Sequence, residues 1–414
     1  MEALFYFVFF YPLYMAFFWM FGSLLFFFRH EYGKQAPPDL PEYPHVAILV
    51  PCHNEAADIR ETIDQLRRNK YPDFEIVAIN DGSADETGAI LDAMAADEPR
   101  LRTVHLVHNC GKAMALRAGA MACRADYIVC IDADTLLDEY AIHWMMSHFL
   151  TGPRVGAVTG NPRIANRRTL LARIQIGEFS AIVGMVKRSQ RDVGRVFTVS
   201  GCIACFRRRA LHNIGYWSPE TVTEDIDVSW KLQLGYWDVR YEPRALAWVA
   251  MPETLLGLWR QRLRWARGGF EAAFKYRSLV KTWTKRRMWP IYLEYVVSAV
   301  WCYAWAFTVL CWLMTLLFPN YWPAALAVDS ILPRWTGVVL GVTCLLQFTI
   351  GLFLDSHYER GIVRNLFWAI WYPAIYWMLS AAATIVAIPK ALRGSTRRTR
   401  VRYATWKSPE RGVH

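Results

Sequence analysis

Two carboxylates separated by one small residue form the part of the sequence best suited to bind a metal ion. Asp132, Ala133 and Asp134 follow an apolar stretch, YIVCI, with the pattern of a buried strand. Hard divalent cations such as Mg²⁺ or Mn²⁺ prefer carboxylate oxygens and leave positions open for phosphate oxygens and water. An ion there would neutralise charge on a departing diphosphate. The tripeptide is common by chance, so alone it is a weak indication.

A second acidic group, Thr223-Glu224-Asp225-Ile226-Asp227, precedes an amphipathic stretch. Acidic residues at this position can simply cap a helix, because the helix dipole favours negative charge at its start. Alternatively, one of these carboxylates is a general base for an incoming sugar hydroxyl. The sequence alone leaves both interpretations open.

Arginine, glutamine and tryptophan residues recur between Leu258 and Trp265. On a helix, Gln261, Arg264 and Trp265 would share one face, because residues three and four apart are neighbours. An arginine can bind phosphate oxygens with two parallel hydrogen bonds, and a tryptophan offers a flat surface for a sugar ring. The alternative is an interfacial helix whose Trp and Arg side chains anchor it at lipid headgroups.

Short apolar runs alternate with polar helical stretches between residues 45 and 134. Strands are predicted at 45–51, 74–81, 102–108 and 126–134, with helices at 56–69 and 113–124 among them. This alternation predicts a mostly parallel sheet with helices on both faces, in which ligands bind beyond the carboxyl ends of the strands. The acidic residues that follow a strand end are Glu55, Asp81, Asp132 and Asp134. We therefore expect them to converge at one edge of the sheet.

Long uncharged segments flank this region. They are residues 3–28, 295–318, 335–354 and 365–388. Each is about 20 residues or longer, enough for a helix to cross roughly 30 Å of hydrocarbon. The first lacks a basic leader and a small-residue cleavage site, so we interpret it as a retained anchor rather than a signal peptide. Residues 29–290 contain no comparable run and are predicted to form a soluble domain.

The composition fits a chain that is partly in the membrane and partly in water. Hydrophobic residues make up 54% of the chain, yet 20% of its residues are charged. The net charge is +11. From Lys390 onward the sequence contains eight basic residues and one acidic residue, Glu410. Because this basic cluster lies next to a predicted span, binding to anionic lipid explains it better than binding to a nucleic-acid polymer does. The scattered cysteines, including Cys202 and Cys205, are predicted to be buried rather than metal-binding.

Taken together, the motifs resemble those of family 2 glycosyltransferases. The sequences PCHNE, NDGSADET, GKAMAL, DAD, TED and QRLRW occur in this order between residues 45 and 270. A QxxRW after TED is typical of the processive members, which make cellulose, chitin, hyaluronan and poly-N-acetylglucosamine. Intervening stretches such as IQIGEFSAIVG and FTVSG are most similar to the bacterial poly-β-1,6-N-acetylglucosamine synthases of biofilm matrix.

This resemblance implies a catalytic domain of the GT-A type, which is Rossmann-like, combined with transmembrane helices. It also implies donor-binding roles for the matching residues. Glu55, Asp81 and Lys112 would hold the uridine part of the donor. Asp132 and Asp134 would bind the diphosphate and a Mg²⁺ or Mn²⁺ ion.

The resemblance assigns the remaining motif residues to catalysis and to the acceptor. Asp225 would be the catalytic base, with Glu224 beside it. Gln261 and Arg264 would bind the donor diphosphate, and Trp265 would bind the acceptor sugar.

An inverting polymerase that uses UDP-GlcNAc is the activity implied, with the growing polysaccharide as acceptor. The family places such an enzyme in the bacterial inner membrane, with its catalytic domain cytoplasmic, and links it to polymer translocation. It also implies a small two-span partner subunit, cyclic di-GMP as an activator of the complex, and contact with membrane lipids. The alternatives are a hyaluronan, chitin or cellulose type of synthase, or a non-processive glycolipid glycosyltransferase. A transporter is disfavoured because a Walker A loop is absent and the predicted spans carry few charges.

Five parts are expected along the chain. They are an N-terminal transmembrane anchor at 1–30, the GT-A domain at 44–251, interfacial amphipathic helices with QxxRW at 252–290, C-terminal transmembrane helices at 291–388 and a basic tail at 389–414. Four full crossings would place that tail opposite the catalytic domain, against the positive-inside tendency. We expect four crossings, with 365–388, broken at Pro373, the segment most open to an incomplete one.

Overall fold

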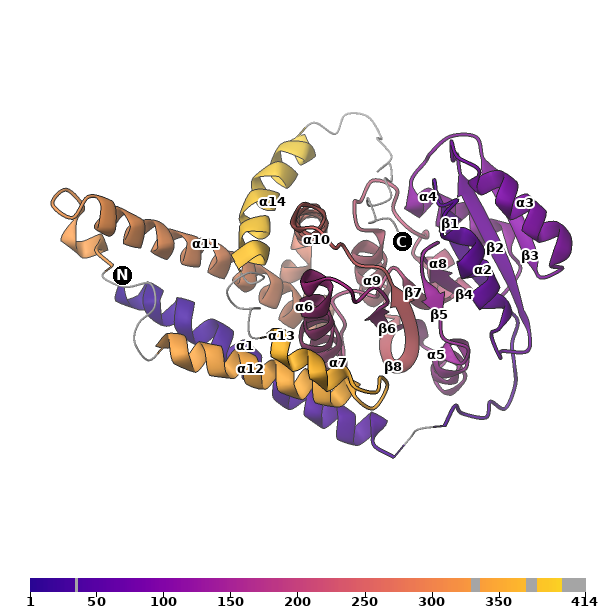
Figure 1. Ribbon diagram of the computed structural model, residues 1–414, viewed down its shortest axis with the longest axis horizontal. Helices are drawn as coiled ribbons and strands as arrows, with labels where there is room; N and C mark the ends of the chain where they lie inside the picture. The colour runs from indigo at the N-terminus through magenta and orange to yellow at the C-terminus, as the bar shows by residue number, and fades with distance from the viewer. Residues whose placement is uncertain (34–35, 329–335, 370–377, 397–414) are drawn as a thin grey trace.

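A mostly parallel sheet forms one side of the computed structural model, at the right in Figure 1, and the structure describes residues 1–33, 36–328, 336–369 and 378–396. The strands are β1 (Val46–Cys52), β2 (Phe74–Asp81), β3 (Leu101–Leu106), β4 (Tyr127–Ile131), β5 (Leu136–Leu137), β6 (Val155–Ile164), β7 (Ile203–Arg207) and β8 (Asp238–Val249). Their order in the sheet is β3-β2-β1-β4-β7-β6-β8-β5. Strands β1 to β4 pair in parallel, as do β6 and β8, whereas β7 and β5 pair antiparallel to their neighbours. The predicted sheet type is therefore confirmed.

Helices cover both faces of this sheet, as the alternation of strands and helices predicted. The helices on one face are α2 (Ile59–Arg67), α3 (Thr87–Asp97) and α5 (Ala141–Thr151), and those on the other are α4 (Lys112–Ala122), α8 (Arg208–Asn213) and α9 (Glu224–Leu234). Alternate residues of β1 enter the two cores: Ile48 packs with the first set and Leu49 with the second. Because both faces are buried, β1 is apolar throughout rather than alternating. Strand β4 ends at Ile131, so Asp132 and Asp134 lie beyond it.

An irregular helical segment, residues 170–193, connects the sheet to the membrane helices, and we name it the docking helix. It consists of α6 (Leu170–Glu178), a π-helical stretch η2 (Phe179–Gly184) and α7 (Met185–Val193). Met185 packs against Ala16 and Met20 of the N-terminal helix, and Ala181 packs against Phe348. In Figure 1 these partners, α1 and α12, run side by side next to α7. This packing of residues 170–193 on α1 and α12 was not predicted from the sequence.

Three stretches of the described residues are long and apolar enough to cross a membrane. They are Glu2–Glu31, Trp283–Leu317 and Gly337–Asp355, which correspond to the helices α1 (Glu2–Phe26), α11 (Trp289–Leu317) and α12 (Thr336–Asp355). Three of the four predicted runs are thus confirmed. The fourth, 365–388, lies partly outside the described residues, between α13 (Leu366–Ala369) and α14 (Met378–Thr396), so its crossing stays a prediction.

The QxxRW motif lies on a long helix, α10 (Leu255–Lys275), as predicted. Thr254 begins this helix: its hydroxyl oxygen accepts a hydrogen bond from the backbone N–H of Gly257 at 3.1 Å. Helix α10 packs against α9 and α14, and two short 3₁₀ helices, η3 (Arg277–Lys281) and η4 (Trp283–Met288), lead from it to α11. It therefore connects the catalytic motifs with the membrane-crossing part of the chain.

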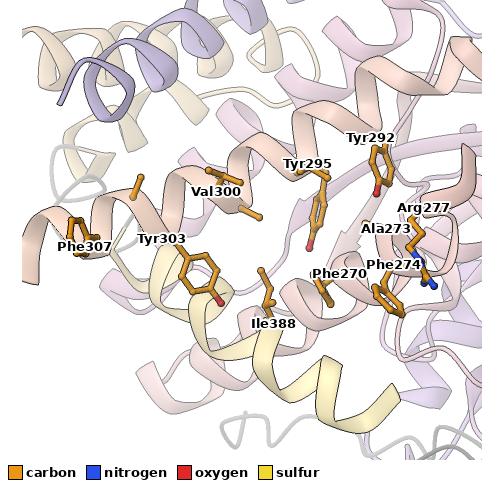
Figure 2. Close-up of a pocket in the computed structure, with 13 residues that line it drawn as sticks. Phe270, Ala273, Phe274, Arg277, Tyr292, Tyr295, Val300, Tyr303, Phe307 and Ile388 are labelled. Carbon is orange, nitrogen blue, oxygen red and sulfur yellow. The ribbon is translucent and has the colours of Figure 1, made fainter. Parts of the chain in front are cut away.

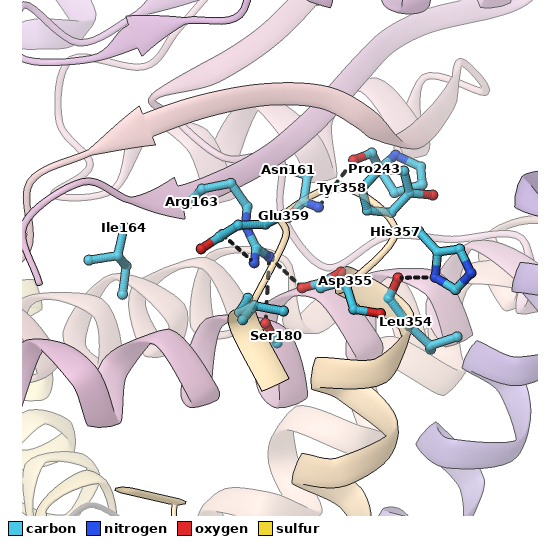
Figure 3. A network of polar contacts seen from close by, with 12 residues as sticks. Asn161, Arg163, Ile164, Ser180, Pro243, Leu354, Asp355, His357, Tyr358 and Glu359 are labelled. Atoms are coloured by element: carbon cyan, nitrogen blue, oxygen red, sulfur yellow. Dashed lines mark hydrogen bonds and ion pairs between the residues drawn. The ribbon is translucent and has the colours of Figure 1, made fainter. Parts of the chain in front are cut away.

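Buried ion pairs fix α1 and α12 to the docking helix and the sheet. Arg188 of α7 donates to Glu31, which follows α1, at 2.8 Å, and to Asp355 at the end of α12 at 2.9 Å. Arg163 of β6 also pairs with Asp355, and with Glu359 at 2.8 Å (Figure 3). All five side chains are at most 8% exposed. Because an unpaired buried charge is strongly unfavourable, this network holds both spans in one position relative to the sheet.

Replacing Arg188 by methionine should destabilise the fold, because Glu31 then loses its arginine while remaining buried. Breaking one partner of a buried pair typically costs about 3–5 kcal/mol. The measurement is the free energy of unfolding of the purified protein in mixed SDS micelles. Arg29→Met is the matched control: Arg29 is 59% exposed and 3.5 Å from Asp192, and such a pair contributes at most about 1 kcal/mol. Equal destabilisation by the two substitutions would contradict this role of the network.

Candidate active site

The ammonium group of Lys112 lies at the centre of a cluster of acidic side chains. Lys112 begins α4, after Gly111, whose φ of 86° allows the sharp turn into the helix. Its Nζ pairs with Asp132 beyond β4, and with Glu224 at the start of α9 at 3.1 Å. It also donates to the carbonyl oxygen of Gly201 at 3.3 Å. Burial disfavours the charged form of Lys112, but Asp132 and Glu224 raise the pKa of Lys112 well above its ordinary value, so Lys112 is charged. Its ammonium group thereby joins three segments of the chain.

One of the acidic residues of α9 has a structural role. Asp227 is fully buried, and its Oδ1 accepts hydrogen bonds from Lys275 Nζ at 2.7 Å and from the Tyr276 hydroxyl at 2.8 Å. These contacts join α9 to the end of α10. The hydrogen bonds of Asp227 therefore give it a structural role, and Glu224 and Asp225 are the remaining candidates for a catalytic role.

Asp225 has the surroundings of a general base. Among the described residues it forms no ion pair, and its carboxylate accepts the backbone N–H of Ile226 at 2.9 Å. Burial, followed by the charge of Glu224, raises the pKa of Asp225 to about 6. For Glu224, burial acts in the same direction, but Lys112 holds its pKa below the ordinary value. A carboxylate with a pKa near 6 is ionised at neutral pH and still basic enough to accept a proton.

The loop of residues 200–202 lies against this cluster, although the sequence suggested no role for it. A Cβ added to Gly201 would lie 3.1 Å from Lys112 Nζ and 3.4 Å from an Asp225 carboxylate oxygen, so the backbone of Gly201 is in close contact with both. The stretch FTVSG, which contains part of the loop, served only to support the family resemblance. Gly201 was the one feature of the sequence that could have indicated that this loop lies at the site.

A buried lysine of the docking helix supports this loop from behind. Lys187 of α7 is 4% exposed, its Nζ donates to the hydroxyl oxygen of Ser200, and it forms no ion pair within the described part of the chain. Burial lowers the pKa of Lys187 to about 8, while the charge of Asp225 acts in the opposite direction. Lys187 was missed because a single lysine in the stretch GMVKR is typical of a solvated helix face.

Helix α10 carries Arg264 towards the acidic cluster. Arg264 is exposed, and its charge lowers the pKa values of both Glu224 and Asp225. The helix can approach this closely because residue 268 is glycine: a Cβ there would lie 2.0 Å from the hydroxyl oxygen of Thr223. The close packing of α10 on the start of α9 therefore depends on Gly268.

The other two residues of the QxxRW motif have different neighbours. Gln261 lies with its Nε2 3.9 Å from the sulfur of Met251, and its buried side-chain oxygen has no hydrogen-bond partner among the residues that the structure describes. Trp265 packs against an apolar cluster that includes Met251, and the Arg262 guanidinium lies 4.3 Å from the centre of its ring. A buried, unpaired amide oxygen and a partly buried indole are suitable partners for a bound hydroxyl and a sugar ring.

The residues predicted at the first two strand ends lie where expected but outside the cluster around Lys112. Asp81, at the end of β2, is fully buried and accepts the backbone N–H groups of Cys110 and Gly111, each at 2.8 Å. It thereby shapes the turn that precedes Lys112. Glu55 follows β1 and is 3% exposed.

Asp132 and Asp134 are suited to share a metal ion with a nucleotide rather than to enclose one. Both are half-buried beyond β4. In the described ranges, no group of three or more acidic, histidine or cysteine side chains forms a complete metal site. Mg²⁺ usually binds through one or two carboxylates, with substrate phosphates and water completing its shell. The donor set therefore fits a hard divalent cation bound together with a diphosphate.

Comparisons with known proteins agree with this geometry. Residues 44–268 match the model of the family described as glycosyltransferase like family 2. A protein of Staphylococcus epidermidis named poly-beta-1,6-N-acetyl-D-glucosamine synthase is 37% identical over 98% of both chains. A Staphylococcus aureus (strain COL) protein of the same name is 38% identical, also over 98% of both chains.

A solved structure supports the fold. It is a mannosyltransferase from Pyrobaculum calidifontis in complex with GDP-Man and Mn²⁺, with a TM-score of 0.58 and 19% identity. The match covers 93% of this chain and 98% of that one, which identifies the fold as GT-A. With a family model that matches more than half of its residues and relatives that match almost its whole length, the chain belongs to the family 2 glycosyltransferases.

Proposed function

We propose that this glycosyltransferase is a processive, inverting synthase that polymerises N-acetylglucosamine from UDP-GlcNAc into β-1,6-linked poly-N-acetylglucosamine. The observation that carries the proposal is the similarity to relatives with that name, which extends over 98% of the chain and so includes the membrane helices. Synthases of hyaluronan, chitin or cellulose share the fold, and the choice among these products rests on that similarity. Biofilm matrix is the proposed destination of the polymer.

Asp225 performs the proton transfer in this proposal. Its carboxylate takes the proton of the acceptor hydroxyl, and the hydroxyl oxygen forms a new bond to the anomeric carbon of the donor. The bond from that carbon to the diphosphate oxygen breaks, and UDP leaves with the bonding electron pair. Attack opposite to the leaving group inverts the configuration, so an α-linked donor gives a β-linked product. Burial and the neighbouring Glu224 make Asp225 basic enough for this step.

Positively charged and polar groups stabilise the leaving diphosphate. Lys112 and Arg264 lie at the acidic cluster and supply positive charge there, and the amide N–H₂ group of Gln261, whose contact with Met251 is a long one of 3.9 Å, donates to a phosphate oxygen. A Mg²⁺ or Mn²⁺ ion held by Asp132 and Asp134 would neutralise charge on the diphosphate when bound.

Further residues position the two substrates. Glu55, Asp81 and Lys112 hold the uridine part of the donor. Trp265 holds the acceptor sugar against its ring, and Glu224 orients the base next to it.

The membrane arrangement follows from this activity. The proposed parts are an anchor at 1–30, the GT-A domain at 44–251, interfacial helices at 252–290, transmembrane helices at 291–388 and a basic tail at 389–414. UDP-GlcNAc is made in the cytoplasm, so the catalytic domain faces the cytoplasm and the polymer crosses the bacterial inner membrane. A small two-span subunit and activation by cyclic di-GMP are part of the proposal.

The donor preference tests the product assignment. Membranes that contain the protein and its partner subunit, supplied with labelled UDP-GlcNAc and Mg²⁺, should form a long polymer that methylation analysis shows to be 1,6-linked. UDP-glucose and UDP-glucuronic acid should give less than about a tenth of that incorporation. Neither sugar has an acetamido group, so the polar groups of the protein that bind this group would be left without a partner. Equal incorporation from UDP-glucose alone would exclude the proposed substrate.

Substitution of the base tests the chemical step. Asp225→Asn should lower the turnover number by about 10²–10⁴-fold, the usual contribution of a general base. The dissociation constant of UDP, measured by calorimetry, should stay within about threefold, because the base acts on the acceptor. As a control, Asp227→Asn should instead lower the free energy of unfolding, since Asp227 bonds Lys275 and Tyr276. A normal turnover number for Asp225→Asn would place the base elsewhere.

The pH dependence of kcat/KM tests the charges around Asp225. Activity should rise as the pH increases through about 6, where Asp225 loses its proton, and stay level above that. In Lys187→Met, the loss of a nearby positive charge should raise the pKa of Asp225, which moves this rise to higher pH by roughly half a unit. Lys187→Arg keeps the charge and should keep the wild-type profile. Identical profiles for all three proteins would show that Lys187 only supports the loop.

A further inference from the structure

We propose that a groove between α10, α11 and α14 binds one anionic phospholipid, with an acyl chain in the groove and the phosphate at Arg277. The groove has a volume of about 590 Å³ and is formed by the C-terminal half of α10, the side of α11 and Ile388 of α14 (Figure 2). A site of this size is within the range of about 300–1,000 Å³ that is usual for small-molecule ligands. This proposal goes beyond the synthase activity and does not depend on it.

The walls of the groove are suited to a hydrocarbon chain. Phe270, Phe307 and Val300 contribute apolar side chains along its length. Two of the three tyrosine hydroxyls along the groove already have partners: Tyr295 donates to the carbonyl oxygen of Ala266 at 3.2 Å, and Tyr303 to that of Ile385 at 3.0 Å. The groove therefore offers ring faces and aliphatic groups. Because α11 belongs to a membrane-crossing stretch, lipid chains are its natural surroundings.

The end of the groove next to the catalytic domain carries a positive charge. Arg277 is exposed, lies 4.1 Å from the centre of the Phe274 ring, and forms no ion pair with any described residue. It is the only charged residue among those that line the groove in the described part of the chain. A guanidinium at the boundary between an apolar groove and water is well placed to bind a phosphate through two hydrogen bonds.

The sequence around Arg277 favours a headgroup with a net negative charge. No acidic residue occurs between Glu271 and Glu294, and besides Lys275, which pairs with Asp227, five basic residues do: Arg277, Lys281, Lys285, Arg286 and Arg287. Basic pockets beside membrane helices bind anionic headgroups in this way. An apolar helix of a partner protein would fill the groove but would leave Arg277 without a counter-charge. A phospholipid satisfies both ends of the groove, so we commit to it.

Native mass spectrometry of the full chain tests this proposal. The protein is equilibrated in nanodiscs with equal amounts of phosphatidylglycerol and phosphatidylcholine, released into detergent, and scored for retained lipid. The wild type should retain one phosphatidylglycerol at least fivefold more often than phosphatidylcholine. Ala299→Phe, which fills the groove, and Arg277→Gln, which removes the charge, should each reduce that retention at least fivefold.

Matched controls separate the groove from the rest of the surface. Val339→Phe enlarges an apolar residue on the exposed side of α12, and Arg209→Gln removes an exposed charge of α8; both should retain lipid as the wild type does. If Ala299→Phe does not fold, Val300→Trp at the exposed rim of the groove replaces it. Equal retention of the two lipids by the wild type, or unchanged retention in both groove variants, would overturn the proposal. Photo-crosslinking from Val300 to a protein rather than to lipid would also overturn it.

Discussion

The ion pairs of Lys112 are the constraint on which the rest of the site depends. One ammonium group holds Asp132 from the edge of the sheet and Glu224 from the start of α9 within reach of the loop at Gly201. Without it, the buried carboxylate of Glu224 and the half-buried carboxylates of Asp132 and Asp225 would repel one another. Because Lys112 pairs with Glu224 and Asp227 is bonded elsewhere, Asp225 is left as the acid that can accept a proton. The assignment of the base is therefore a consequence of how the neighbouring charges are satisfied.

The docking helix connects this site with the membrane. Two adjacent residues of α7 have separate partners: Arg188 pairs with acids at the ends of α1 and α12, and Lys187 contacts the active-site loop at Ser200. Helix α10 makes a second connection, since it presents Arg264 to the acidic cluster and continues through η3 and η4 into α11. The catalytic groups are thus held by elements that are themselves fixed to membrane-crossing helices. This arrangement would suit the proposed export of the polymer through the membrane.

Features that depend on local pattern were predictable from the sequence. The strand at 74–81 matches β2, because a short apolar run bounded by polar residues has few alternatives. Its terminal Asp81, and Asp132 after β4, lie at the same edge of the sheet, beyond the carboxyl ends of the strands, because parallel strands share a direction. The apolar length of α1, α11 and α12 likewise predicted their capacity to span a membrane.

Features that depend on partners distant in the sequence were not predictable. Arg188 is charged and looks like a surface residue until Glu31 and Asp355, more than 150 positions away, are brought against it. The difference between Asp225 and Asp227 also needs the tertiary contact with Lys275. Pattern alone assigns the same role to every acid in the motif.

The position of the acceptor hydroxyl tests most directly whether Asp225 is the catalytic base. It can be seen by electron cryo-microscopy of the full chain with a non-transferable UDP-GlcNAc analogue, Mn²⁺ and an acceptor oligosaccharide. We expect the attacking hydroxyl to lie within about 2.6–3.2 Å of the Asp225 carboxylate, on the side of the anomeric carbon opposite to the diphosphate. A hydroxyl that instead faces Glu224, or that has no contact with Asp225, would contradict this expectation.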